Sequence, residues 1–198
     1  MTQLVLASQS PRRAELLTQM GLPFQVFVAD IDESQLAEEL PNAYVERLAR
    51  EKCDRGMELA KTKGVGFLAA IGADTIVLLD DEILGKPRGL KEGTAMLRRL
   101  SGRTHEVLSG VAVSDGVRLE STVVSSRVTF RSLDEAEIQA YWATGEGADK
   151  AGSYGIQGIG GILVEQLEGS FSGVMGLPVQ ETEALLQSLN VDTWTLRS

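Results

Sequence analysis

The stretch Leu4–Arg13, which reads LVLASQSPRR, passes directly from a buried strand into a helix. Leu4–Ala7 is a short apolar run of the kind that forms an interior strand. Ser10-Pro11 combines a typical N-cap residue with a proline suited to the first helical position. Gly21 provides a stop signal, so the pattern predicts a helix that runs to about Met20.

Strand-like and helix-like segments alternate along the rest of the chain. The expected strands cover residues 24–28, 67–71, 76–79 and 162–167, and two β-like segments flank the turn Ser114–Gly116 as in a hairpin. The expected helices begin near Asn42 and extend past Lys52, cover residues 92–100 and 179–189, and run through Trp142 after a capping box of Ser132 and Glu135. Residues 145–161 contain too many glycines for an ordinary helix. This alternation predicts a mixed α/β fold.

The composition indicates a globular chain with an acidic balance. Among 198 residues, 19 are Lys or Arg and 28 are Asp or Glu, which gives a formal net charge of −9. Such a chain is poorly suited to duplex nucleic acid or an anionic membrane, so we expect neither as a partner. The length favours a single domain over residues 1–198, with or without two lobes.

The scarcity of cysteine and histidine limits the metal chemistry. Cys53 and His105 are the only residues of their types, which excludes an intramolecular disulfide and the ligand pairs of zinc sites. A catalytic metal would be a hard ion with oxygen ligands, such as Mg²⁺ or Mn²⁺. We interpret His105 as a structural or surface residue. The N-terminus lacks a signal-peptide pattern and no apolar run is long enough to span a bilayer, so we expect a cytoplasmic setting.

Two arginines stand where a helix dipole disfavours cations. Arg12 and Arg13 fall in the first turn of the first helix, near the positive end of its dipole. An anionic ligand would offset this cost, because free backbone N–H groups, the Ser8 and Ser10 hydroxyls and two guanidinium groups together form a phosphate cradle. A solvated arginine pair and a Ser-Pro phosphorylation site are the alternatives.

Two further charged residues lie among apolar ones. Lys52 shares a helix face with Val45, Leu48, Ala49, Cys53 and Gly56. Its ammonium either reaches the surface along its apolar stem or enters a site as a cation. Asp74 interrupts an apolar run, and a buried carboxylate needs a cation, a metal or strong donors. We interpret it as a metal ligand or general base at a strand end, with a self-capping turn over residues 73–75 as the alternative.

Weaker signals complete the set of candidate residues. Glu33, in the acidic loop 30–33, is placed to share a metal with Asp74, although such a loop is more often only solvated. Lys86 lies in the rigid turn Gly85–Pro87, which is otherwise an ordinary surface loop. The sequence contains neither a P-loop nor a Rossmann glycine motif. The cations and carboxylates at the ends of helices and strands nevertheless predict metal-assisted phosphate chemistry. These residues are Arg12, Arg13, Lys52, Lys86, Asp32 or Glu33, and Asp74.

Six motifs occur in order along residues 4–180. They are Leu6–Arg13, Gly72–Thr75, Lys86–Pro87, Ser101–His105, Asp149–Gly158 and Gly176–Pro178. Together they resemble the Maf family of nucleoside-triphosphate pyrophosphatases. This resemblance implies a Maf/inosine-triphosphatase-like fold, with an elongated mixed β-sheet flanked by helices and two lobes with a central cleft. It also implies a protein that is usually a homodimer and that cleaves a nucleoside triphosphate to the monophosphate and pyrophosphate.

The resemblance also implies roles for individual residues. Asp74 matches the proposed proton acceptor, and Arg12, Thr75 and Gln157 match base-selection positions in a pattern that resembles the dTTP/UTP branch. The other matching cleft residues are Ser8, Arg13, Glu33, Lys52 and Lys86. We therefore expect catalysis by Asp74, Lys52 and Lys86 and a divalent metal, Mg²⁺ or Mn²⁺, on Glu33 and Asp74. Substrate binding is expected from Ser8, Arg12, Arg13, Thr75 and Gln157.

Two alternatives accompany this expectation. The branch that acts on 7-methyl-GTP is the nearest competitor for substrate, and modified pyrimidine nucleotides are plausible additional substrates. A nucleotide-binding regulator of cell division without turnover is the alternative of a different class, suggested by the association of the family with septum formation. Release of pyrophosphate from UTP distinguishes an enzyme from such a regulator.

Overall fold

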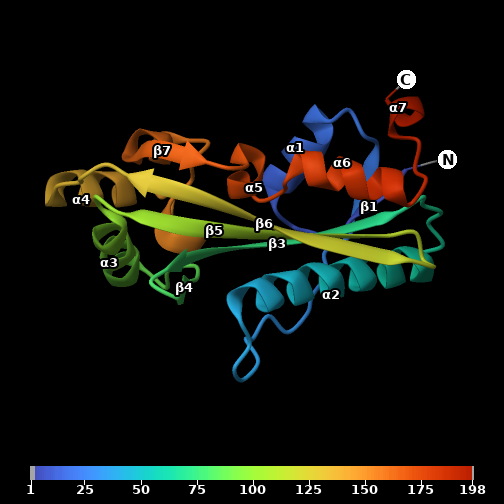
Figure 1. Ribbon diagram of the computed structural model, residues 1–198, viewed down its shortest axis with the longest axis horizontal. Helices are drawn as coiled ribbons and strands as arrows, with labels where there is room; N and C mark the ends of the chain where they lie inside the picture. Colours follow the sequence, from blue (N-terminus) through green and yellow to red (C-terminus); the bar gives the residue numbers. More distant parts are fainter. Residues whose placement is uncertain (1–2, 198) are drawn as a thin grey trace. The chain divides into compact units, whose positions relative to one another are not determined.

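The computed structural model describes residues 3–197 as a mixed β-sheet flanked by helices (Figure 1). Its strands are β1 (Leu4–Leu6), β2 (Phe24–Val26), β3 (Ala70–Leu79), β4 (Glu82–Leu84), β5 (Thr104–Ser114), β6 (Leu119–Phe130) and β7 (Val164–Glu168). Its α-helices are α1 (Pro11–Gln19), α2 (Pro41–Thr62), α3 (Leu90–Leu100), α4 (Glu135–Ala143), α5 (Phe171–Met175), α6 (Val179–Ser188) and α7 (Thr193–Leu196). Two short 3-10 helices, η1 (Ala151–Ser153) and η2 (Ile159–Leu163), follow α4. The expected α/β class is confirmed.

The pairing of the strands makes the sheet mixed. The strand order is β2-β1-β3-β5-β6-β7, and β4 also pairs with β3. β1 is parallel to both neighbours, with Leu4 opposite Phe24 and Val5 opposite Ala70. β4 is antiparallel to β3, and β7 is antiparallel to β6. The parallel pairs are connected through α1 and α2, as parallel strands require long crossover connections.

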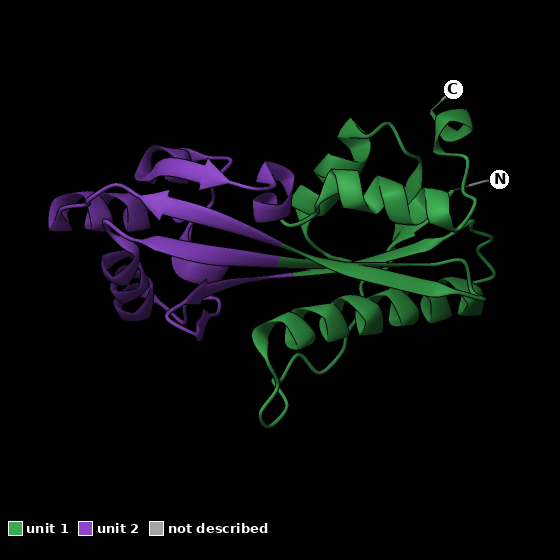
Figure 2. Cartoon of the chain, in the orientation of Figure 1, with its two compact units in different colours: residues 1–74, 109–124, 176–198 green, residues 75–108, 125–175 purple. Residues whose placement is uncertain are grey.

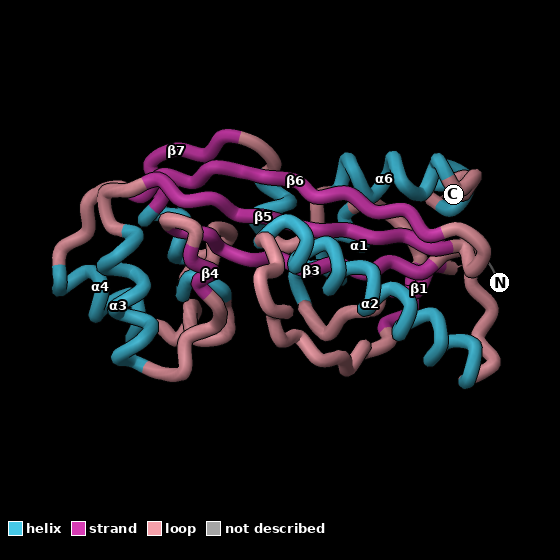
Figure 3. Tube along the Cα trace, turned by 60° about the horizontal axis from the view of Figure 1, so that its bottom comes forward, coloured by secondary structure: helices cyan, strands magenta, loops and turns pink. Residues whose placement is uncertain are grey.

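The chain divides into two compact units (Figure 2). Unit 1 comprises residues 1–74, 109–124 and 176–198, and unit 2 comprises residues 75–108 and 125–175. Within unit 1, α2 covers one face of the sheet, whereas α1 and α6 cover the other (Figures 1 and 3). The interpretation of the whole chain as one domain stays a prediction. Among the described residues, no helix has the length and hydrophobicity needed to cross a membrane.

Small residues allow α2 to approach the sheet closely in unit 1. The buried cluster between them includes Val5, Ala49, Cys53, Ala70 and Ala112. A side chain at Gly72 would collide with the main chain of α2 at Ala49 and Cys53. Glycine at position 72 is therefore required for this packing, which brings Lys52 of α2 against β3.

The core of unit 2 contains a buried aromatic group around His105. The rings of His105, Phe130 and Tyr154 meet edge to face, with centroids 4.8 to 5.4 Å apart. His105 is only 2% exposed, and its Nε2 atom lies 2.8 Å from the Tyr154 hydroxyl. Burial lowers the pKa of His105 to about 4. The structural interpretation of His105 is confirmed, and the surface alternative is wrong.

The strands expected at residues 67–71 and 76–79 belong to one continuous strand, which begins only at Ala70. β3 runs from Ala70 to Leu79 and passes through the Gly72–Thr75 motif without a turn. The turn alternative for Asp74 is therefore wrong. Asp74 does not interrupt the strand because Lys52 neutralises its carboxylate, a contact between residues 22 positions apart.

The start of α4 differs from the predicted capping box. Asp134 is the N-cap, and its carboxylate accepts from the Glu137 N–H at 2.8 Å, while Glu137 accepts from the Asp134 N–H at 3.1 Å. Ser132 and Glu135 fit the same local pattern two residues earlier. The anionic Asp134 is the stronger acceptor beside the positive helix end. The hairpin prediction is confirmed, because residues 115–118 connect β5 directly to β6.

Candidate active site

The N-terminus of α1 carries two arginines and no acidic residue. Ser10 is its N-cap but makes no side-chain capping bond. Arg13 Nη1 donates to Ser8 Oγ at 3.1 Å, and Arg13 Nε donates to the Gly176 carbonyl at 2.8 Å. The Ser8 hydroxyl oxygen also accepts from the Ser10 N–H at 3.1 Å. Ser8 and Arg13 are thus held together where β1 leads into α1, beside a positive helix end that suits an anion.

Lys52 forms a buried ion pair with two carboxylates. The lysine is only 7% exposed, and its Nζ atom lies 2.7 Å from Asp74 Oδ1 and 2.6 Å from Glu33 Oε1. Its burial and these partners show that the surface alternative is wrong, whereas its role as a cation in a ligand site stays a prediction. Asp74 has the cationic partner that its burial requires.

The local sequence explains why Lys52 reaches Asp74. Positions 72 and 74 lie on the same face of β3 because successive residues of a strand point to opposite faces. Gly72 lies against the main chain of α2, so Asp74 also faces α2. Lys52 is on the buried face of α2 expected from the sequence, together with Val45, Leu48, Ala49, Cys53 and Gly56.

Electrostatics connect the arginine at α1 with this ion pair. Desolvation lowers the pKa of Arg13, and the adjacent Arg12 acts in the same direction. The carboxylates of Asp74 and Glu33 oppose both effects and raise the Arg13 pKa. Arg13 therefore lies within electrostatic reach of both acids. We call Ser8, Arg13, Glu33, Lys52 and Asp74 the charged cluster; all belong to unit 1.

Arg12 has no internal partner among the residues that the structure describes. Its side chain makes no hydrogen bond or ion pair with residues 3–197. The guanidinium of Arg13, in contrast, is already held by Ser8 and Gly176. Arg12 therefore retains its full set of donors for an external anion.

The donor set of the charged cluster suits a divalent ion only in combination with a ligand. Asp74 and Glu33 supply hard carboxylate oxygens and approach the same Lys52 ammonium. Within the described part of the chain, no three His, Cys, Asp or Glu side chains gather as metal ligands. Mg²⁺ is commonly held by one or two carboxylates plus substrate phosphates, so these two residues fit such an ion.

Three predicted site residues fall in unit 2. Thr75 follows Asp74 in β3, and Gln157 lies exposed in the glycine-rich segment. Lys86 is exposed, and its side chain makes no hydrogen bond or ion pair within residues 3–197. The Gly152 N–H donates to the Gly85 carbonyl at 3.2 Å, so the Lys86 turn lies beside the glycine-rich segment. Convergence of these residues with the charged cluster stays a prediction.

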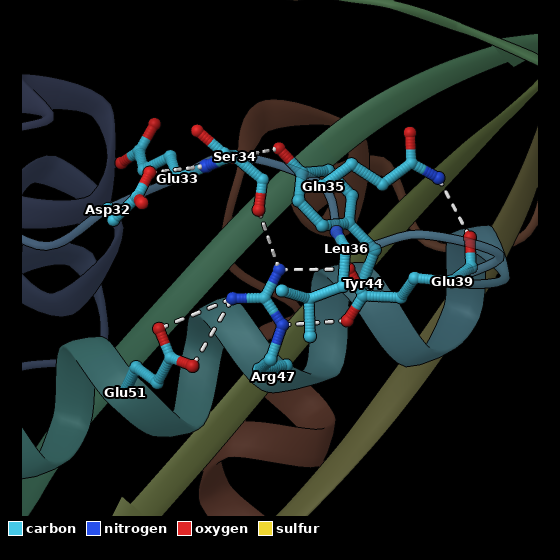
Figure 4. A network of polar contacts seen from close by, with 9 residues as sticks. All are labelled: Asp32, Glu33, Ser34, Gln35, Leu36, Glu39, Tyr44, Arg47 and Glu51. Atoms are coloured by element: carbon cyan, nitrogen blue, oxygen red, sulfur yellow. Dashed lines mark hydrogen bonds and ion pairs between the residues drawn. The ribbon is translucent and has the colours of Figure 1, made fainter.

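Sequence reasoning did not identify the residues that hold the acidic loop. Arg47, Tyr44 and Glu39 form polar contacts with the segment that contains Glu33 (Figure 4). The spacing of Arg47 and Glu51 was visible as an i, i+4 pair on one helix. Glu39, in contrast, belongs to an irregular loop whose contact with Arg47 has no local signature.

A separate hollow of about 450 Å³ lies on the exposed face of α2. It is lined by Ala43, Glu46, Arg47, Arg50, Glu51 and Asp54. None of the predicted site residues lines it, and its charges are mixed. We therefore locate the candidate site by the charged cluster and not by this hollow.

Comparison with known sequences identifies the family. The sequence pattern of a family described as Maf-like protein matches residues 3–189. The chain belongs to the Maf family. It is 48% identical to the dTTP/UTP pyrophosphatase of Pseudoalteromonas atlantica, over 95% of this chain and 97% of the relative. The dTTP/UTP pyrophosphatases of Pseudoalteromonas translucida and Vibrio cholerae are 51% and 49% identical, over 92% and 93% of this chain and 95% and 97% of the relatives. The resemblance based on six motifs is thereby confirmed.

Proposed function

We propose that this chain hydrolyses nucleoside triphosphates, dTTP and UTP in particular, to the monophosphate and pyrophosphate. The observation that carries this proposal is the buried Lys52 flanked by Asp74 and Glu33, within electrostatic reach of Arg13. This arrangement combines a carboxylate that can accept a proton with cations that can bind phosphate. The relatives named dTTP/UTP pyrophosphatase, about half identical along nearly the whole chain, support the choice of substrate.

Asp74 is the proposed proton acceptor. Its Oδ1 atom is bound by Lys52, which fixes the orientation of the carboxylate and leaves Oδ2 for a water molecule. The water oxygen forms a bond to the α-phosphorus, and the bond from that phosphorus to the α–β bridging oxygen breaks. The bridging oxygen leaves with the electron pair on pyrophosphate, while the proton of the water passes to Asp74.

The cations of the chain bind the phosphates in this proposal. Arg13, oriented by Ser8 and Gly176, lies at the positive end of α1, and Arg12 offers an unpaired guanidinium there. Together with Lys52 and Lys86 they stabilise the charge that develops on the leaving pyrophosphate. Asp74 and Glu33 would hold a divalent ion such as Mg²⁺ or Mn²⁺, which neutralises phosphate charge and activates water when bound.

Base selection is assigned to Arg12, Thr75 and Gln157. The Gln157 amide supplies one acceptor and two donors, which match the polar edge of a pyrimidine. A site that satisfies its polar groups with one base rejects a base that leaves them unpaired. We therefore expect Gln157→Ala to reduce discrimination among bases more than it weakens triphosphate binding.

The test is pyrophosphate release by the purified full chain from UTP, dTTP, CTP and 7-methyl-GTP. UTP and dTTP are expected to be the best substrates, EDTA should abolish turnover, and added Mg²⁺ or Mn²⁺ should restore it. Preference for 7-methyl-GTP would assign the chain to the alternative branch. Binding of UTP without pyrophosphate release would favour the nucleotide-sensing regulator and overturn the proposal.

The biological setting follows from the same proposal. Nucleoside triphosphates and Mg²⁺ are abundant in the cytoplasm, so we propose that the enzyme acts there. We also propose that it is a homodimer, as the resemblance to the Maf family implies. Light scattering of the purified chain measures the second part directly. A mass near that of two chains of 21.3 kDa supports a dimer, whereas the mass of one chain contradicts it.

A further inference from the structure

The loop that carries Glu33 has little regular structure of its own. Residues 31–36 contain no strand, helix or turn, and most of them are exposed. The Glu33 side chain is itself 55% exposed, although its carboxylate contacts the buried Lys52. An exposed irregular segment needs specific contacts to keep one conformation. The residues that supply them therefore decide where Glu33 lies.

Arg47 of α2 binds this loop at three points (Figure 4). Its Nε and Nη2 atoms donate to the two oxygens of Glu39 at 2.7 and 2.8 Å. Nη2 also donates to the Ser34 carbonyl at 3.0 Å, and Nη1 lies 3.2 Å from Glu51 on the next turn of α2. Only a guanidinium fork can make this set of bonds at once, because a lysine ammonium is a single point of donation.

Glu39 and Tyr44 each contact Arg47 and also bond to the main chain of the loop. The Glu39 side chain is only 8% exposed, and its Oε2 atom accepts from the Leu36 N–H at 3.0 Å. Tyr44 packs under Arg47, whose guanidinium carbon lies 5.5 Å from the ring centroid. The Tyr44 hydroxyl donates to the Glu33 carbonyl itself at 2.6 Å. Main-chain groups at positions 33, 34 and 36 are thus each tied to this group.

We propose that Arg47 is a positioning residue that, through Glu39 and Tyr44, sets the place of Glu33 beside Lys52. This inference rests on the proposed function, because it assigns Arg47 an effect on hydrolysis through Glu33. The hydrogen bonds of Arg47 go to Glu39, Ser34 and Glu51, so its role is to hold the loop. A surface ion pair without this role would contribute little to activity.

The decisive experiment is a double-mutant cycle with Arg47→Lys and Glu33→Gln in the full chain. Arg47→Lys keeps the charge but removes the fork, and we expect kcat for UTP to fall roughly 10- to 100-fold because a displaced group loses its productive geometry. In the Glu33→Gln background the same change should lower kcat less than about twofold, because Arg47 is proposed to act through Glu33, which is already replaced. An equal loss in both backgrounds would overturn the proposal.

Arg55→Lys is the matched control on the same helix. Arg55 forms an exposed pair with Glu58 at 3.1 Å, so its replacement tests the general cost of an Arg-to-Lys change on α2. We expect kcat within about twofold of the original chain. If Arg47→Lys does not fold, as judged by circular dichroism, Tyr44→Phe replaces it in the cycle. Tyr44→Phe removes one hydroxyl and should give a smaller loss of kcat, again absent in the Glu33→Gln background.

Amide hydrogen exchange tests the positioning separately from activity. Arg47→Lys should accelerate amide exchange in residues 31–40 relative to the original chain. Arg55→Lys should leave the exchange of these residues unchanged. If the unmodified chain releases no pyrophosphate, the proposed function fails while the exchange result still judges whether Arg47 holds the loop. Unchanged exchange in residues 31–40 of Arg47→Lys would refute the inference, whatever the activity.

Discussion

Two irregular loops of this protein are held by side chains of opposite charge. In unit 1, the Arg47 guanidinium binds Glu39 and the Ser34 carbonyl. In unit 2, the Glu146 carboxylate accepts from the N–H groups of Ile159 at 2.7 Å and Gly160 at 2.8 Å. In unit 1 a guanidinium thus donates to oxygen acceptors of the loop, whereas in unit 2 a carboxylate accepts from backbone N–H groups of the loop.

The second anchor also depends on a tyrosine. The Tyr141 hydroxyl donates to Glu146 at 2.9 Å and accepts from the Gly155 N–H at 3.1 Å. A Cβ atom at Gly158 would collide with the Glu146 carboxylate, so a larger residue there would displace this carboxylate from its hydrogen bonds. The pair Tyr141 and Glu146 therefore holds both ends of the segment that contains Gln157.

The two loops contribute different kinds of group to the proposed reaction. The loop of unit 1 delivers a charged group, Glu33, to a buried cation. The loop of unit 2 delivers a neutral amide, Gln157, which can recognise a base by hydrogen bonds. Changes that loosen the Glu33 loop should therefore alter the rate, and changes that loosen the Gln157 loop should alter the choice of substrate.

The largest effect is expected at the charged cluster. Asp74→Asn should lower kcat for UTP by roughly 10²–10⁴-fold, because the amide cannot accept the proton of the attacking water. The measurement is initial-rate kinetics of pyrophosphate release. Asp80→Asn is the control, since Asp80 is an exposed partner of Arg103 with a positive φ that asparagine tolerates. Near-normal turnover by Asp74→Asn would mean that another group accepts the proton of the attacking water, and it would contradict the role of the charged cluster in setting the rate.

The next effect concerns the titratable group buried in unit 2. The pKa of His105 falls from about 6.5 unfolded to about 4 folded because burial disfavours the charged ring. Between these values the unfolded chain binds a proton that the folded chain does not, so stability is complete above pH 6.5 and is lost as the pH falls toward 4. The loss should reach about 3 kcal/mol.

His105→Gln isolates this contribution, because glutamine can still bond to Tyr154 but does not titrate. Urea unfolding at several pH values gives the free energy of unfolding of both chains. The stability of the original chain relative to His105→Gln should decrease by about 3 kcal/mol between pH 7 and pH 4. A difference that is constant with pH would contradict the assignment of a neutral, buried His105.

The smallest effect is expected at the anchor of the Gln157 loop. Glu146→Gln replaces one accepting oxygen with an NH2 group that faces backbone N–H donors. We expect the ratio of kcat/KM for UTP over CTP to fall about 10-fold, which corresponds to one lost hydrogen bond, while kcat for UTP changes less. Glu135→Gln, at an exposed pair with Arg98, is the control. A loss of rate with unchanged selectivity would mean that the Gln157 loop does not control base choice.

Much of the fold could be read from local patterns. Ser10-Pro11 begins α1 as predicted, and the turn at Asp115 connects β5 and β6. The error at β3 has a different origin, because Asp74 interrupts the apolar pattern of a strand. Its partner Lys52 lies on another element, and no local pattern encodes a pairing that depends on tertiary packing.

The candidate site was predicted by residue type and not by geometry. Buried charges are costly, so Lys52 and Asp74 could be recognised as members of a site. The sequence suggested that Glu33 and Asp74 share a metal, which stays a prediction; it did not indicate that both carboxylates contact the Lys52 ammonium. The contacts of Arg47 with the loop could not be predicted, because an arginine on an exposed helix face resembles a solvated residue. Its partners in the loop form no periodic pattern.

The most direct test of the proposed chemistry is hydrolysis of UTP in water enriched with ¹⁸O, followed by mass spectrometry of the products. Water attack at the α-phosphorus predicts one ¹⁸O atom in UMP and none in pyrophosphate. Label in pyrophosphate with unlabelled UMP would place the attack at the β-phosphorus and contradict the role given to Asp74 and its neighbours.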